Sequence, residues 1–80
     1  MRQSDLKRAV MAALNGDWEI SHNIAQKYSD NSAIWLHAVL HKIEGDESNS
    51  RYWYARTAGQ RYEQFSDVNE ELNLILSKLL

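Results

Sequence analysis

Apolar residues recur along the chain at the three- and four-residue spacing that places side chains on one face of an α-helix. Five segments show this spacing, and polar or glycine-containing stretches separate them. The pattern predicts helices over residues 4–14, 18–28, 33–44, 50–58 and 67–79. The three glycines lie where these patterns stop, as expected of residues that adopt the left-handed conformation at a helix end. No segment of strand length combines period-two alternation with β-branched residues, so we expect no strands.

Polar residues that favour helix N-termini precede several of these segments. Ser4 and Asp17 stand at the cap positions of the first two helices. Asp67 opens the last helix, and Glu70 follows at the spacing of a capping box. The sequence therefore predicts an all-α, compact bundle of about five short antiparallel helices, in which residues 1–80 form a single helical domain.

The segment 33–44 is apolar nearly all the way round. Its large apolar side chains cover more than a third of the helix circumference: Trp35, Leu36, Val39, Leu40 and Ile43. A helix with so little polar face belongs at the centre of a bundle.

His37, His41 and Glu44 form a narrow polar strip on this central helix, at spacings i, i+4 and i+7. Two imidazoles on successive turns can share one metal ion, and a carboxylate one turn on can complete a set for zinc, manganese or iron. These three residues are the candidate metal ligands.

Three other polar residues extend this candidate site. His22 lies midway along the preceding helix, which we expect to run antiparallel beside the central one, and Gln26 follows one turn later. Asp46 comes just after the central helix ends. Three interpretations stay open: structural hydrogen bonding among these side chains, a ligand pocket without metal, and a metal site.

Residues 51–56 concentrate aromatic and cationic side chains in less than two helical turns. Tyr52 and Arg56 are candidate ligand-binding residues, because this segment can line an aromatic pocket or form a platform on which a base or a cation stacks. The alternative is that the aromatics belong to the core and that Arg51 or Arg56 pairs with Glu44 or Asp46.

Charge and composition argue against several classes of function. A net charge of −2 and the lack of a basic stripe argue against nucleic-acid binding. The chain has no Cys, which excludes disulfides and thiolate sites. No apolar run reaches signal-peptide or bilayer-spanning length, so we expect a cytoplasmic protein without a membrane partner.

Two leucines of the last helix, Leu74 and Leu80, lie outside its main apolar stripe. They are either individually exposed side chains or part of a partner surface, most simply a homodimer seam.

The chain resembles a family of small, uncharacterised helical proteins from bacteria and fungi over residues 18–59. The family pattern reads W-E-x-A-H-x-x-A-Q, then W-x-H-A-x-L-H-R-x-E-G/P-D, then N-A-x-Y-W-Y-R-R-A-G. Here the matching stretches are WEISH with Gln26, WLHA followed by LHKIEGD, and YWYAR with Gly59. The chain departs from the pattern at Ser21, Lys42, Ser50 and Thr57. The resemblance implies a helical fold and a candidate site but no reaction.

The segment YWY also resembles the second helix of Sel1-type or tetratricopeptide repeats, which implies a TPR-like helical hairpin at the centre of the bundle.

The candidate site supports two functional hypotheses. The first is a binding or adaptor module whose polar His/Glu pocket, walled by Trp and Tyr side chains, takes a small molecule or a protein segment, with no cofactor. The second is a small metal-dependent hydrolase in which His37, His41 and Glu44 hold a divalent metal and His22 acts as general base.

Overall fold

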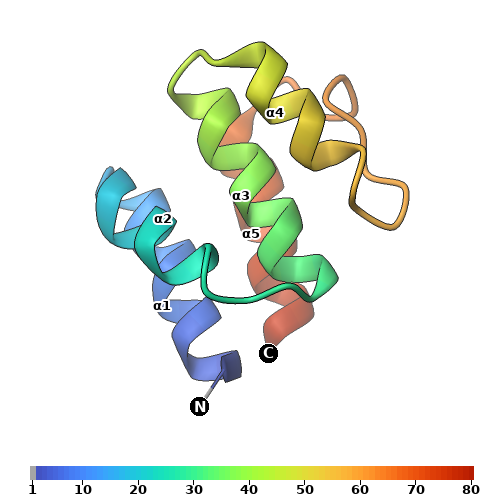
Figure 1. Cartoon of the computed structure of the whole chain (residues 1–80). Helices are drawn as coiled ribbons and strands as arrows, with labels where there is room; N and C mark the ends of the chain where they lie inside the picture. Colours follow the sequence, from blue (N-terminus) through green and yellow to red (C-terminus); the bar gives the residue numbers. More distant parts are fainter. Residues whose placement is uncertain (1) are drawn as a thin grey trace.

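Helix α3 (Asn31–Ile43) is the central element of the computed structural model, which describes residues 2–80 (Figure 1). It contacts each of the other four helices. These are α1 (Arg2–Leu14), α2 (Trp18–Ala25), α4 (Glu47–Tyr54) and α5 (Val68–Leu79). α1 also packs against α2 and α5, and residues 2–80 contain no strand. The prediction of an all-α bundle of five helices with an apolar helix at its centre is therefore confirmed.

Glycine ends the central helix as its position predicted. Gly45 has a φ of 84°, and its N–H donates to the carbonyl of Lys42 at 3.1 Å. The N–H of Asp46 reaches back to the carbonyl of His41 at 3.0 Å. This pair of bonds is the Schellman arrangement, which satisfies the last carbonyls of a helix and needs a residue that tolerates positive φ.

The predicted boundaries of α4 were wrong at both ends. The helix begins at Glu47 instead of residue 50, because the Asp46 carboxylate accepts a hydrogen bond from the N–H of Asn49 at 3.2 Å. It ends at Tyr54 instead of residue 58. The Thr57 hydroxyl donates to the Tyr54 carbonyl at 2.7 Å and competes for an acceptor that a further helical turn needs.

Of the three predicted N-cap residues of the other helices, one forms a side-chain cap bond. Ser4 lies inside α1, which includes Arg2, and Gln3 donates from its side chain to the carbonyl of Leu79. Asp17 holds the cap position of α2 but makes no side-chain cap bond. Asp67 does cap α5, through the N–H of Asn69 at 2.9 Å.

A buried carboxylate joins α3, α4 and α5. Glu71 is 1 % exposed and accepts three hydrogen bonds. The donors are the Lys42 ammonium at 2.8 Å, the Tyr54 hydroxyl at 2.6 Å and the Trp35 indole at 2.7 Å. Burial and the neighbouring carboxylate raise the pKa of Tyr54, because both disfavour a phenolate there. The network therefore supplies a buried charge with both a counter-ion and neutral donors.

The Lys42 ammonium also holds the segment between α4 and α5. It donates to the carbonyls of Tyr62 and Phe65 at 3.0 and 3.1 Å. It also lies 5.1–5.2 Å from the ring centres of Tyr54 and Tyr62. One side chain thus attaches a segment without helix to the core.

Ser21 gives a first testable prediction, because its hydroxyl is fully buried and has no hydrogen-bond partner among the described residues. Replacing Ser21 by Ala should raise the free energy of unfolding by about 1 kcal/mol, since an unsatisfied buried hydroxyl is costly. The matched control is Ser50→Ala: Ser50 is equally buried, but its hydroxyl donates to the Ala38 carbonyl at 2.7 Å. Urea unfolding should show opposite shifts for the two variants, and a loss of stability in Ser21→Ala contradicts the argument.

The two leucines of the last helix differ in exposure, and the homodimer seam stays a prediction. Leu80 is 83 % exposed, whereas Leu74 is half-buried and packs against the core.

No helix in residues 2–80 has the length and apolar character that a bilayer crossing requires.

Candidate metal centre

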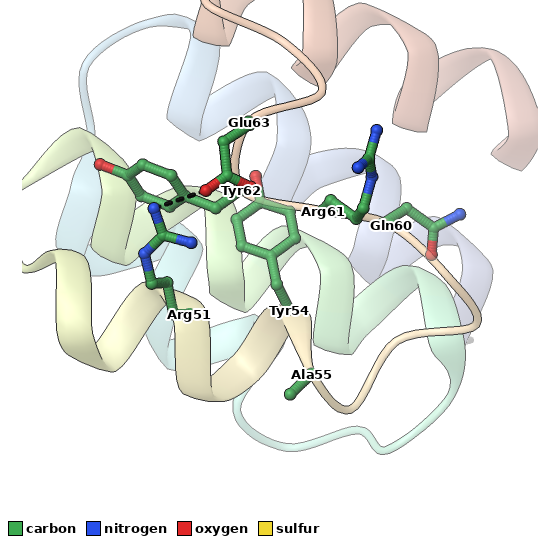
Figure 2. A pocket seen from close by; sticks show the side chains of 7 residues that line it. All are labelled: Arg51, Tyr54, Ala55, Gln60, Arg61, Tyr62 and Glu63. Atoms are coloured by element: carbon green, nitrogen blue, oxygen red, sulfur yellow. Dashed lines mark ion pairs between the residues drawn. The ribbon is translucent and has the colours of Figure 1, made fainter.

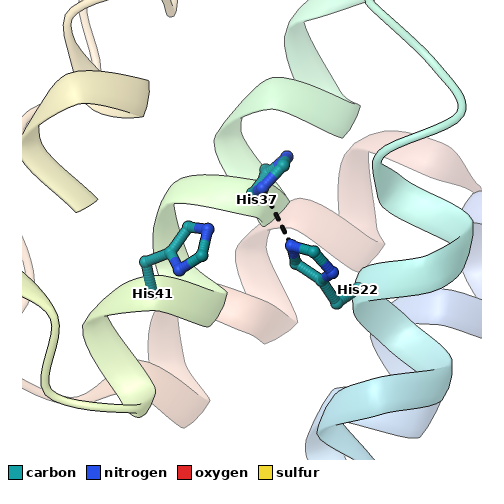
Figure 3. A group of neighbouring side chains, drawn as sticks. All are labelled: His22, His37 and His41. Carbon is teal, nitrogen blue, oxygen red and sulfur yellow. Dashed lines mark hydrogen bonds between the residues drawn. The ribbon is translucent and has the colours of Figure 1, made fainter. Parts of the chain in front are cut away.

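Three imidazoles from two helices meet at the surface of α3 (Figure 3). His37 and His41 lie on successive turns of α3, and His22 comes from α2. The Nε2 atoms of His22 and His37 are 3.1 Å apart. The ring centre of His41 lies 5.4 Å from that of His22 and 4.9 Å from that of His37. One nitrogen from each ring lies within 4.8 Å of the other two.

Trp18 holds α2 against α3 so that His22 faces the other two imidazoles. Its indole N–H donates to the Leu40 carbonyl at 2.6 Å, which links α2 directly to the central helix. The same indole stacks on the His22 ring with centres 4.6 Å apart. Because Trp18 and His22 are one turn apart on α2, they share a face, and the bond to Leu40 turns that face toward α3.

A second tryptophan also stacks on the cluster. Trp53 of α4 stacks on His37 with ring centres 4.1 Å apart. His37 and His41 are each only 7 % exposed, and His22 is half-buried. Indoles therefore stack on two of the three imidazoles, and little of the cluster is open to solvent.

This environment keeps two of the imidazoles in their neutral form at pH 7. Burial, followed by the neighbouring His22 and His41, lowers the pKa of His37 from 6.5 to about 4. Burial and His41 also lower the pKa of His22. A neutral imidazole keeps a free lone pair on one ring nitrogen, which is the form that binds a metal ion.

Glu44 orients the third imidazole. Its carboxylate lies 2.6 Å from the Nδ1 of His41. Because a carboxylate accepts hydrogen bonds, Nδ1 carries the proton, and Nε2 is the nitrogen that remains for another partner. The Asn49 amide nitrogen lies 3.5 Å from this Nε2. A carboxylate behind a histidine ligand is a common arrangement around metal ions.

The predicted metal set of His37, His41 and Glu44 is not one of the clusters that the structure forms within residues 2–80. His22 takes the place of Glu44 in the three-histidine cluster. A second cluster combines His41 with Glu44 and Asp46. In that cluster Glu44 bonds to His41, and the Asp46 carboxylate caps α4.

Three predicted ligand-binding residues lie apart from these clusters. Gln26 is exposed, and its amide donates to Asn23 at 3.4 Å. Tyr52 and Arg56 are also exposed and stack on each other, with the guanidinium carbon 3.9 Å from the ring centre. The expectation that an arginine pairs with Glu44 or Asp46 was wrong.

Arg51 instead bonds to Glu63 at 2.6 Å, beneath the ring of Tyr62 (Figure 2). Its guanidinium also bonds to Glu47 at 2.8 Å. These contacts lie at a pocket of about 190 Å³. Its lining residues are Arg51, Tyr54, Ala55, Gln60, Arg61, Tyr62 and Glu63. None of the predicted site residues lines this pocket, and one of its two lining arginines, Arg51, is already paired with two carboxylates.

Three residues around the histidines were not among the predicted site residues, although Trp and Tyr side chains were expected to form the walls of the pocket. Trp18 stands four residues before His22, a spacing that places both on one helix face, so its contact was open to prediction. Trp53 and Asn49 had no comparable signal, because only the packing of α4 on α3 brings them to the site.

Independent comparisons offer no functional parallel for this centre. Models of known protein families, curated proteins and solved structures gave no match to the chain. The resemblance to a bacterial and fungal family therefore stays a prediction, and the geometry of the three imidazoles is what indicates a function.

Proposed function

We propose that this protein binds one divalent transition-metal ion, zinc foremost, through His22, His37 and His41. The observation that carries the proposal is the approach of three ring nitrogens within 4.8 Å of one another, two of them 3.1 Å apart. Two imidazole nitrogens on a tetrahedral zinc ion are separated by about 3.3 Å. Small adjustments of the side chains are therefore enough to bring all three nitrogens onto one ion.

The ligand chemistry favours zinc, copper, nickel or cobalt over manganese. An all-imidazole set suits zinc, copper, nickel or cobalt, whereas manganese favours carboxylate and carbonyl oxygens. Glu44 serves in this proposal as the carboxylate that holds His41 through Nδ1, and it does not bind the metal itself. His22 is likewise a metal ligand, which removes it from the general-base role of the hydrolase hypothesis.

The competing interpretation is a purely structural cluster. In that case one of the facing nitrogens of His22 and His37 donates a hydrogen bond to the other across 3.1 Å. This arrangement satisfies the pair without metal, so the two interpretations differ in what happens when an ion is supplied.

The test is zinc binding by metal-stripped protein, measured by calorimetry and by thermal unfolding. We expect one zinc ion per chain, with a stabilisation of about 2.7 kcal/mol when free zinc is 100 times its dissociation constant. His22→Ala should abolish the one-to-one binding. Glu44→Gln should weaken it by about 10- to 100-fold, because it removes the charged partner of His41.

Gln26→Ala is the matched control, since this exposed residue lies one turn from His22 and contacts only Asn23. Its zinc affinity should equal that of the wild type. Wild-type protein without saturable zinc binding, or His22→Ala with unchanged affinity, refutes the proposal and leaves the structural cluster.

A further inference from the structure

The three-histidine cluster supplies one ligand fewer than a closed zinc site. Structural zinc ions have four protein ligands, whereas sites with three keep a position for water or another external ligand. Within residues 2–80 no further His, Cys, Asp or Glu joins His22, His37 and His41 in one cluster. An ion held there needs a fourth ligand from outside this set.

Asn49 is the polar side chain placed to contact such a ligand. It is half-buried in the first turn of α4, and the Asp46 cap fixes its backbone N–H. Its amide nitrogen lies 3.5 Å from the Nε2 of His41. A metal ion on Nε2 takes the lone pair that this amide faces, so the amide needs another acceptor. The nearest acceptor for this amide is then an atom of another ligand bound to the metal ion.

We infer that the fourth metal position is completed by a water molecule that small monodentate anions replace, and that the Asn49 amide donates a hydrogen bond to this ligand. The inference rests on the proposed metal binding. The ligand is small because His37 and His41 are only 7 % exposed and indoles stack on His22 and His37. Asn49 is therefore a positioning residue for the exchangeable ligand.

The experiment uses the full chain loaded with cobalt(II), which replaces zinc and gives visible absorption bands that depend on its ligands. Titration with azide should shift these bands along a saturable curve, because azide replaces the water. Asn49→Ala should weaken azide binding by about tenfold, the effect of losing one hydrogen bond of about 1.4 kcal/mol. Its affinity for cobalt should change much less.

Ser48→Ala is the matched control on the same turn of α4, since Ser48 is exposed and contacts Asp46 at 3.4 Å. It should bind azide as the wild type does. Cobalt bands that azide leaves unchanged overturn the open position, and equal azide affinity in Asn49→Ala overturns the role of Asn49. In both cases the metal still binds, whereas a protein that takes up no cobalt refutes the proposed function itself.

Discussion

Replacing Lys42 by Met should lower the free energy of unfolding by about 3–5 kcal/mol, because it leaves Glu71 buried without its counter-ion. The methionine keeps most of the aliphatic volume, so the loss reports on the charge and on the bonds that the ammonium makes. Those bonds include the carbonyls of Tyr62 and Phe65, whose segment should become more susceptible to proteolysis. A domain of this length has a total stability of roughly 4–12 kcal/mol, so the effect is large.

Urea unfolding of single and double variants separates the ion pair from packing. Lys42→Met combined with Glu71→Gln should be more stable than Lys42→Met alone, because no unpaired carboxylate remains buried. Lys78→Met is the control, since Lys78 is an exposed residue of α5 and should cost less than about 0.5 kcal/mol. A Lys42→Met variant that is as stable as this control contradicts the argument.

Acidification should begin to destabilise the metal-free protein above the pH range in which its carboxylates protonate. The pKa of His37 falls from 6.5 to about 4 in the folded state, so the unfolded chain binds the proton first. Folding stability is therefore complete above pH 6.5 and decreases as the pH falls toward 4. The shift corresponds to a loss of roughly 3 kcal/mol, and the lowered pKa of His22 adds a loss in the same direction.

The measurement is the free energy of unfolding in urea, from about pH 7 to about pH 4, on wild type and on His37→Gln. The glutamine cannot gain a proton, so its pH dependence should be much flatter. Two carboxyls also have a lowered pKa: Asp5, mainly through the Tyr28 hydroxyl, and Glu63, mainly through Arg51. They cause a loss of stability only as the pH approaches their ordinary values of 3.8 and 4.5, so the slope above about pH 5 reports on the histidines. Equal slopes in wild type and His37→Gln show that other groups cause the acid loss.

Much of the candidate site was within reach of local reasoning. His37 and His41 are one turn apart, so any helix places them side by side. The expected antiparallel packing of the preceding helix also brought His22 toward them. The ligand set was not predictable in the same way, because Glu44 follows at the correct spacing but bonds to Nδ1 of His41. Only the packing of α2 against α3 decides that His22 faces the other two imidazoles.

The sequence by itself determined the five helices, their central member and the glycine that ends it, because helix periodicity and backbone conformation are local properties. The tertiary structure decided which polar groups meet. Lys42 and Glu71 are 29 residues apart and become an ion pair only when α3 packs on α5. Trp53 and Asn49 reach the histidines for the same reason. Contacts between distant segments depend on how whole helices pack, and the spacing within one helix does not encode that packing.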